Sequence, residues 1–188
     1  VEDIYLPYKP KRKTRASIAK EKGLEPLAMR LYTQENGNVE EWAKPFINEE
    51  KGVNNIDEAL DGAIDILAEF ITEHEITRTK LRKLFIQKSM IVSKVISGKE
   101  GEGNKYEIYF DNKELIRKIS SHRLLAMLRG ENEGYLRVKV EPDEEEALDL
   151  LYNIHLKADN EAAGCVADAI DDGYKRLLQP QLETEMRQ

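Results

Sequence analysis

The chain has 188 residues, of which 40% are hydrophobic and 35% are charged, and its formal net charge is −7. This length fits one large domain or two small ones, and the apolar content suffices for a core. The single cysteine, Cys165, excludes an internal disulfide and indicates a reducing compartment, so we expect a cytoplasmic protein. No apolar run approaches the roughly 20 residues that span a bilayer, so we expect no membrane partner. No signal peptide is visible, and because the chain begins at Val1 without Met, we interpret it as a piece of a longer protein.

The first 22 residues form a basic segment in an otherwise acidic chain. They hold seven Lys or Arg and three acidic residues, a net charge of +4, so residues 23–188 carry −11. Pro7 and Pro10 disfavour helix, which predicts an extended arm that leads into a helix. A basic arm on an acidic body suits a polyanion or an acidic protein surface.

The cations of this arm are candidate phosphate contacts, and we select Lys11, Arg12, Lys13 and Arg15. Cations that neutralise phosphates release counterions, and tyrosines close by can stack on bases. In the alternative interpretation, Tyr5, Leu6 and Tyr8 pack the arm onto another part of the parent protein while the cations remain solvated. The residues alone favour neither interpretation.

Capping residues and prolines predict a series of short helices at the start of the chain. Thr14 is a suitable N-cap for a helix that ends near Gly23. A second helix is expected to start at Glu25–Pro26 and to stop at Asn36–Gly37. Residues 40–46 are weakly helical and are interrupted by a proline.

Two longer helices are expected next, and we predict that they form an antiparallel pair. Asn55 and Glu58 have the spacing of a capping box, and apolar residues then recur on one helical face as far as Ile71. Thr77 is expected to cap the following helix, whose apolar stripe would run from residue 81 to residue 96.

Glycines at positions 98, 101 and 103 interrupt this pattern and mark a possible boundary between two subdomains near residues 98–104. The aromatic stretch 106–110 is ambiguous, and residues 115–119 fit a short helical turn. Ser121 opens a helix that ends at Gly130 or Gly134. Alternation of apolar and polar residues makes 135–140 the best strand candidate in the chain.

The remaining residues predict two more helices. Pro142, followed by four acidic residues, is a strong helix start. Asp159 is expected to open a last long helix, and Pro180 either kinks this helix or starts a new segment.

The helix opened by Ser121 carries a second group of candidate anion contacts. His122 and Arg123 lie at its N-terminus, where free N–H groups and cations together suit an anion. Arg129 follows about two turns later on a similar face. The alternative is a capped core helix with a surface His and Arg.

No motif predicts catalysis, a metal site or a bound cofactor. The sequence contains no His-Glu-x-x-His and no second cysteine for a zinc site. The loop Gly98–Gly103 lacks the Lys-Ser/Thr ending of a phosphate loop, and its two glutamates would repel phosphate. We therefore expect a protein that is not an enzyme.

Six segments, in order along nearly the whole chain, resemble the bacterial Tex family of transcription accessory proteins. They are Tyr5–Ala28, Ala63–Glu69, Val92–Val95, Ser121–Arg123, Leu128–Gly134 and Tyr174–Glu183. The chain departs from the family pattern around Tyr106–Leu115, so the resemblance assigns no role to that loop.

The resemblance implies a multidomain, largely helical parent that binds nucleic acid, RNA or DNA, mainly through other domains, and acts with RNA polymerase. It places this chain in the helical N-terminal region, upstream of a YqgF-type ribonuclease-H-like domain. The expected fold is mainly α, a helix-turn-helix-like assembly with one or two short strands, in which a basic arm (1–22) precedes a helical region (23–188). The expected role is to bind nucleic acid without catalysis. The alternative is a scaffolding module that docks on neighbouring domains or on polymerase.

Overall fold

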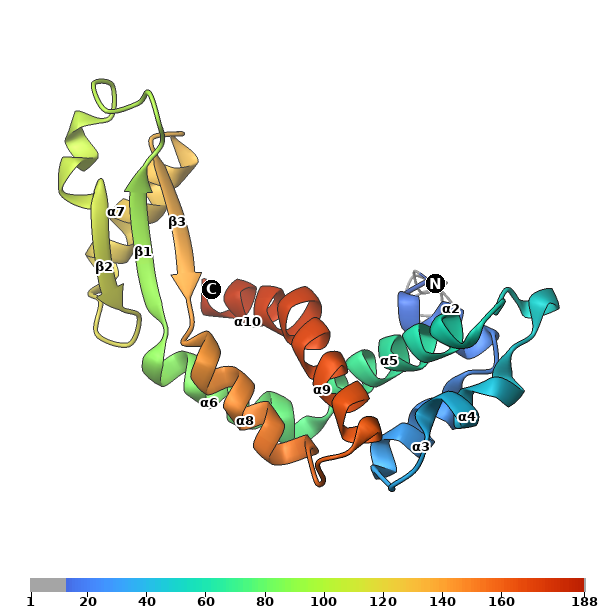
Figure 1. Ribbon diagram of the computed structural model, residues 1–188. Helices are drawn as coiled ribbons and strands as arrows, with labels where there is room; N and C mark the ends of the chain where they lie inside the picture. Colours follow the sequence, from blue (N-terminus) through green and yellow to red (C-terminus); the bar gives the residue numbers. More distant parts are fainter. Residues whose placement is uncertain (1–12, 188) are drawn as a thin grey trace, which may run out of the picture. The chain divides into compact units, whose positions relative to one another are not determined.

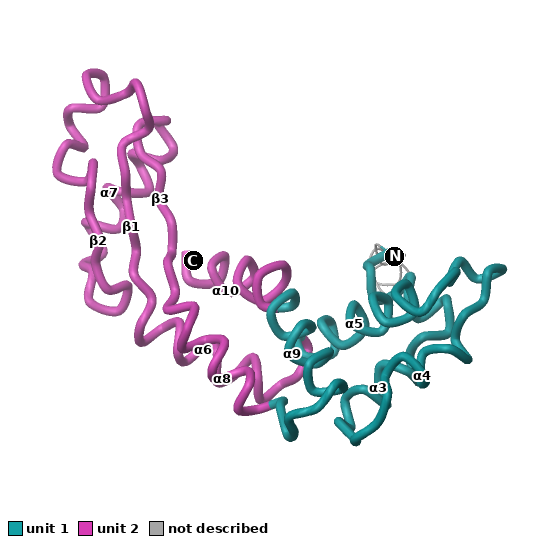
Figure 2. Tube along the Cα trace, in the orientation of Figure 1, with its two compact units in different colours: residues 1–72, 155–173 teal, residues 73–154, 174–188 magenta. Residues whose placement is uncertain are grey.

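A computed structural model describes residues 13–187, which form a mainly helical protein with one small antiparallel sheet (Figure 1). The mainly α fold class expected from the sequence is therefore confirmed, although the sheet has three strands in place of one or two, and the helix-turn-helix-like arrangement stays a prediction. The chain divides into two compact units (Figure 2): unit 1 holds residues 1–72 and 155–173, and unit 2 holds residues 73–154 and 174–188. Residues 98–104, where the sequence suggested a boundary, lie within unit 2.

Unit 1 begins with a helix whose N-cap, Thr14, was predicted from the sequence. Helix α2 (Arg15–Glu21) starts at Thr14, whose side chain accepts from the Ser17 N–H, while the Ser17 side chain accepts from the Thr14 N–H. This reciprocal capping box satisfies two N–H groups that the helix cannot pair internally. Four short elements follow: α3 (Glu25–Thr33), α4 (Val39–Ala43) and the 3-10 turns η2 (Lys44–Phe46) and η3 (Glu49–Lys51).

The long helix α5 (Ile56–Glu73) has the predicted pair Asn55 and Glu58 at its N-terminus, but the Glu58 side chain bonds to a different residue than a capping box requires. The Glu58 N–H donates to Asn55 Oδ1 at 2.9 Å, as a capping box requires. The Glu58 carboxylate reaches one residue further back than expected and accepts from the Asn54 N–H at 2.7 Å. The buried face of α5 contributes Ala63, Leu67 and Ile71 to the core of unit 1.

Unit 1 is completed by a segment from late in the chain, helix α9 (Glu161–Gly173), which packs against α3. The Ala163 N–H donates to Asn160 Oδ1 at 2.9 Å, so Asn160 is the N-cap. The expected helix start at Asp159 was therefore one residue early, because Asp and Asn are equally good caps and the sequence places them side by side.

Unit 2 opens with helix α6 (Glu75–Lys88) and strand β1 (Met90–Val95), where a single long helix was expected. That prediction is wrong: the chain turns extended at Ser89, and the β-branched residues Ile91, Val92 and Val95 favour a strand. The prediction that Thr77 caps α6 is also wrong. His74 is the N-cap, and its Nδ1 accepts from the N–H of the buried Thr77. The expected antiparallel helix pair joins α5 and α6, which belong to different units, and stays a prediction.

Three strands form the sheet of unit 2 in the order β2-β1-β3. Strand β2 (Asp111–Leu115) and strand β3 (Leu136–Glu141) both pair antiparallel with the central strand β1. The strand predicted from the alternation at 135–140 is confirmed. The ambiguous aromatic stretch forms a 3-10 helix, η4 (Asn104–Tyr109), and Leu115 ends a strand before a hydrogen-bonded turn.

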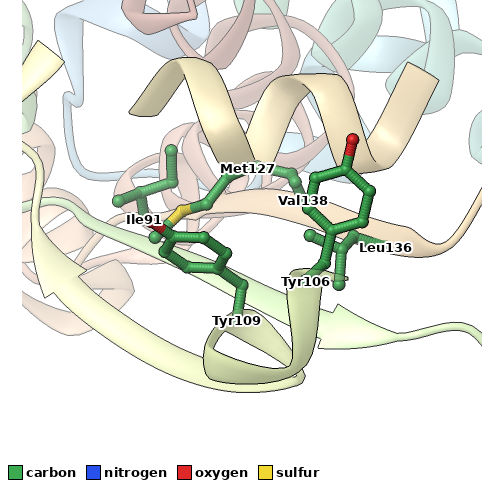
Figure 3. Packing of buried hydrophobic residues seen from close by; sticks show 6 residues of the cluster. All are labelled: Ile91, Tyr106, Tyr109, Met127, Leu136 and Val138. Carbon is green, nitrogen blue, oxygen red and sulfur yellow. The ribbon is translucent and has the colours of Figure 1, made fainter. Parts of the chain in front are cut away.

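One face of this sheet is covered by helix α7 (Ser121–Asn132) and by η4 (Figure 1). Between the sheet and these two helical segments lies a cluster of buried side chains, which Figure 3 shows: Ile91, Tyr106, Tyr109, Met127, Leu136 and Val138. Gly130 permits the close approach of α7, because a Cβ at this position would lie 2.5 Å from Leu136 Cδ1. The cluster is thus built from both helical and strand segments of unit 2.

The rest of unit 2 is helical: α8 (Glu144–His155), the π-helical turn η5 (Tyr174–Leu178) and α10 (Gln179–Met186). Pro180 lies in the first turn of α10, where its missing N–H costs no hydrogen bond within that helix. The chain is therefore helical on both sides of it, π-helical before α10 and α-helical within it. The Arg82 guanidinium binds Glu185 (2.8 Å from Nε to Oε2) and holds α10 against α6. Across residues 13–187, no helix is both long enough and apolar enough to span a membrane.

Candidate nucleic-acid interface

The arm candidates are only partly visible. Lys11 and Arg12 lie outside the described residues. Lys13 is exposed and its Nζ lies 3.7 Å from a Glu21 carboxylate oxygen, an ion pair that water largely screens. Arg15 is the exposed first residue of α2. The two described arm cations therefore lie on the surface at the start of one short helix.

The structure separates the three candidates on α7. His122 and Arg129 are exposed, whereas Arg123 is half-buried and paired with Glu114. Arg123 Nε lies 3.1 Å from both carboxylate oxygens of Glu114, and Arg123 Nη2 lies 3.0 Å from Oε2. The guanidinium also lies 5.3 Å from the ring centroid of Tyr109. Arg123 therefore fastens α7 to β2 and η4, and its Nε and Nη2 donors already bind Glu114.

The bond to Arg123 sets the charge state of Glu114. Hydrogen bonds from the guanidinium, with a further one from Asn112, lower the pKa of Glu114 against the opposing effect of burial. The same pairing raises the pKa of Arg123. Both groups are consequently charged at neutral pH, and they offset each other.

An acidic neighbour also offsets Arg129. The Glu133 carboxylate accepts a 2.5 Å hydrogen bond from the Tyr106 hydroxyl and lies 3.0 Å from Lys105 Nζ. These bonds, together with the positive charges of Lys105 and Arg129, lower the pKa of Glu133. A charged carboxylate therefore lies close to Arg129 at this end of α7.

A stronger concentration of cations lies on the solvent face of the sheet, opposite α7. The register places Lys94 of β1 beside Arg137 of β3, and Val92 between Lys113 of β2 and Lys139 of β3. Directly opposed residues share one face of a sheet, so these four cations project from the same side. All four are exposed, while the intervening Val92 is only 7% exposed beneath them.

Acidic residues neutralise only part of this face. Lys113 Nζ lies 3.4 Å from a Glu141 carboxylate oxygen, across the central strand. Asp111 is opposite Lys94 in the register. Within residues 13–187, no ion pair or hydrogen bond engages the side chains of Lys94, Arg137 or Lys139. We call these three residues, with Lys113, the cationic sheet face.

The cationic sheet face was not predicted from the sequence, although two of its four cations lie in the strand that was predicted. Arg137 and Lys139 alternate with the buried Leu136, Val138 and Val140 in the strand that was predicted. The partner Lys94 was hidden because its segment was assigned to a helix. No group of three or more His, Cys, Asp or Glu in the described part of the chain could hold a metal ion.

Comparisons with known proteins agree with the motif resemblance. Residues 34–188 match the family model described as Tex central region-like. The chain is 40% identical to the uncharacterized protein YdcI of Bacillus subtilis over its whole length, and 46% identical to the transcriptional accessory protein Tex of Neisseria gonorrhoeae over 77% of it. It is 29% identical over its whole length to the human S1 RNA-binding domain-containing protein 1.

The chain spans only 26%, 19% and 20% of these three relatives, respectively. The family model names the matching stretch a central region, whereas the motifs alone had suggested the N-terminal helical region. The match covers well over half of the chain, and the bacterial relatives are far above the identity expected by chance. The chain therefore belongs to the Tex family.

Proposed function

We propose that this chain is a non-catalytic part of a transcription accessory protein that contacts the backbone of nucleic acid and acts with RNA polymerase. The observation that carries the proposal is the cationic sheet face, where Lys94, Arg137 and Lys139 project from adjacent strands without ion-pair partners among the described residues. The chain as a whole is acidic, with a net charge of −7, so this local excess of positive charge is not a consequence of composition.

The spacing of these cations suits a polyanion. Neighbouring strands lie about 4.8 Å apart, so cations on three adjacent strands cover a width of roughly 10 Å. A phosphate chain that crosses such a face can meet two or three of them, and each neutralised phosphate releases close to one counterion. Because the strands are hydrogen-bonded together, the backbone positions that carry the cations are fixed before binding.

The names of the relatives support a role with nucleic acid. The Neisseria gonorrhoeae relative is named a transcriptional accessory protein, and the human relative is named for an S1 RNA-binding domain. Since the chain spans about a fifth of these two proteins, it supplies one surface among several.

The test replaces the three unpaired cations in Lys94→Gln/Arg137→Gln/Lys139→Gln and measures binding of the 188-residue chain to mixed-sequence nucleic acid over a salt series. The control, Lys44→Gln/Lys51→Gln/Lys80→Gln, removes the same charge from three exposed lysines outside the sheet. We expect the salt slope of log K to fall by about 3 in the first variant and to hold in the control. Equal slopes in the two variants would refute the proposal.

A second candidate function is docking on a neighbouring domain of the parent without nucleic-acid contact. It is favoured by two apolar side chains of unit 2 that are unusually exposed, Ile108 at 68% and Leu125 at 60%. Most of the parent lies outside this chain, so its other domains are the natural cover for these side chains. Hydrogen exchange tests this: docking predicts slower exchange around residues 108 and 125 in the full-length protein than in the 188-residue chain.

A further inference from the structure

We propose that the cationic sheet face binds the phosphates of a double helix, and that it does not bind single strands by base stacking. This inference rests on the proposed function and adds the class of nucleic acid that the surface fits. The inference depends on which side chains lie on the open face of the sheet and which lie on the face that α7 covers.

The open face contains no aromatic ring. The register assigns nine side chains to it: Met90, Val92 and Lys94 on β1, Asp111, Lys113 and Leu115 on β2, and Arg137, Lys139 and Glu141 on β3. Sheets that bind single strands use aromatic side chains on this kind of face to stack on the bases. Here only cations, two carboxylates and small or aliphatic side chains are offered.

The aromatic residues close to the sheet are committed to its other face. Tyr106 and Tyr109 are 5% and 6% exposed in the cluster beneath α7 (Figure 3). Phe110 and Tyr135 pack against the same cluster. The Tyr106 hydroxyl is further held by its hydrogen bond to Glu133. Tyr106 and Tyr109 would have to leave a packed core before any base could stack on them, and Phe110 and Tyr135 are partly buried against that core.

Without stacking, charge density decides which nucleic acid binds best. A double helix carries one phosphate per about 1.7 Å of axis, against 3.4 Å for each strand, and releases more counterions per contact, about 0.9 against about 0.7. For three contacts this difference alone favours the duplex by about fourfold at 0.1 M salt. A single strand recovers affinity mainly by stacking, at about 1–3 kcal/mol per base, and this face supplies no ring for it.

Contacts to phosphates also carry no sequence information. The open face has no Asn or Gln to pair with adenine, and its cations are spread over three strands and do not form a helix or ribbon that could enter a groove. We therefore expect this surface to bind duplexes of different sequence equally.

The experiment compares binding of the 188-residue chain to a short DNA duplex, an RNA duplex of the same sequence, each separated strand and polyglutamate, by fluorescence anisotropy. We expect at least one duplex to bind at least about fourfold more tightly than its own strands, and polyglutamate to bind more weakly than that duplex. The two duplex arms identify which double helix is the better ligand.

The variants of the previous section give the second readout. In Lys94→Gln/Arg137→Gln/Lys139→Gln, duplex affinity should fall at least about tenfold and the preference for duplex should disappear. The matched control should keep both. Circular dichroism establishes that each variant is folded, which is expected because all substituted side chains are exposed.

Two failures are distinguishable. If the triple variant binds every nucleic acid as the control does, the proposed function itself is wrong. If it loses affinity for duplex and single strands to the same extent, or if single strands or polyglutamate bind the unmodified chain as tightly as either duplex, the surface binds polyanions but the duplex inference is overturned.

Discussion

Gln34 Nε2 donates a 2.7 Å hydrogen bond to the main-chain oxygen of His155, so a single side chain joins two parts of unit 1 that are 121 residues apart. Gln34 Oε1 accepts a second bond of the same length from the Lys157 N–H. Gln34 is 4% exposed and has a left-handed backbone, with φ +57°. It ends α3 and fixes the point at which the returning chain meets it.

Two substitutions of Gln34 should separate the contribution of its side-chain hydrogen bonds to stability from the cost of its left-handed backbone. Gln34→Ala removes both of these hydrogen bonds and a third, which Nε2 donates to the main-chain oxygen of Tyr32, and should destabilise the protein by about 2–3 kcal/mol. Gln34→Gly loses the same bonds but relieves the left-handed strain, so it should be about 1 kcal/mol less destabilised than the alanine variant. Urea unfolding measures both; a wild-type midpoint for Gln34→Ala would contradict the role of the hydrogen bonds.

The same substitution at two helical glycines should act in opposite directions. At Gly130 in α7 a new Cβ would meet the buried Leu136 and Tyr106, so Gly130→Ala should destabilise the protein by about 1–3 kcal/mol. At Gly164 in α9 nothing lies within 4 Å of the added atom, so Gly164→Ala should stabilise by about 0.5–1 kcal/mol through helix propensity. Thermal unfolding of the two variants provides the comparison, and a Gly130→Ala variant as stable as the wild type or more stable would show that α7 can move away from β3.

Tyr174 predicts a pH effect. Its hydroxyl is buried and has no hydrogen-bond partner within residues 13–187, and burial raises its pKa above the ordinary 10.0. Since the unfolded tyrosine ionises first, the protein should lose stability as the pH rises above about 10, while nothing is lost from this group below that pH. Tyr174→Phe should remove this part of the alkaline loss and raise stability at neutral pH by about 1 kcal/mol.

The measurement for Tyr174→Phe is the free energy of unfolding at neutral and alkaline pH. Tyr135→Phe, at a half-buried position, controls for the loss of a hydroxyl elsewhere in unit 2. Identical alkaline profiles for wild type and Tyr174→Phe would show that the buried hydroxyl does not resist ionisation.

Arg123 should behave as a structural residue and not as a nucleic-acid contact. Arg123→Gln is expected to destabilise unit 2 while leaving the salt slope of nucleic-acid binding unchanged. The lowered pKa of Glu114 also sets the direction of a pH effect. The ion pair stabilises the fold at pH values above the ordinary carboxyl pKa, and this stabilisation is lost as the pH falls through the pKa of Glu114 in the folded protein. A double-mutant cycle with Glu114→Gln at neutral and acidic pH tests this, and a coupling energy that persists at low pH would count against it.

The cations of the basic arm are still predicted to contact nucleic acid. Charge reversal in Arg12→Glu/Arg15→Glu should weaken nucleic-acid binding by the full-length protein and flatten its salt dependence, because two cations are replaced by acids. A salt slope equal to that of the wild type would favour the alternative, in which the arm packs on another part of the parent.

The sequence predicted elements whose signals are local. The caps at Thr14 and Asn55 and the alternation around Arg137 each depend on residues within a few positions, and all three appear in the structure. The break between α6 and β1 was missed because apolar residues there fit both a helical and an extended period. Only pairing with strands about 20 and 45 residues away resolves that ambiguity in favour of β1, since the ladder supplies the hydrogen bonds.

The candidate site shows the same division. Exposed cations could be located from the sequence, but their partners could not. Arg123 looked free until Glu114 was placed beside it, and Lys94 gained its neighbour Arg137 only through the strand register. Whether a cation is available to a ligand is a property of long-range packing, which local patterns do not contain.

The chain passes between its two units after residues 72, 154 and 173, so each unit is closed by a segment that returns from later in the sequence. No single cut therefore separates the units: a truncation after residue 154 removes α9 from unit 1 and α10 from unit 2 together. Deletion mapping would assign to the removed residues any binding that is lost because the remaining parts unfold. Function in this region can be assigned safely only by exchanging individual side chains on an intact backbone.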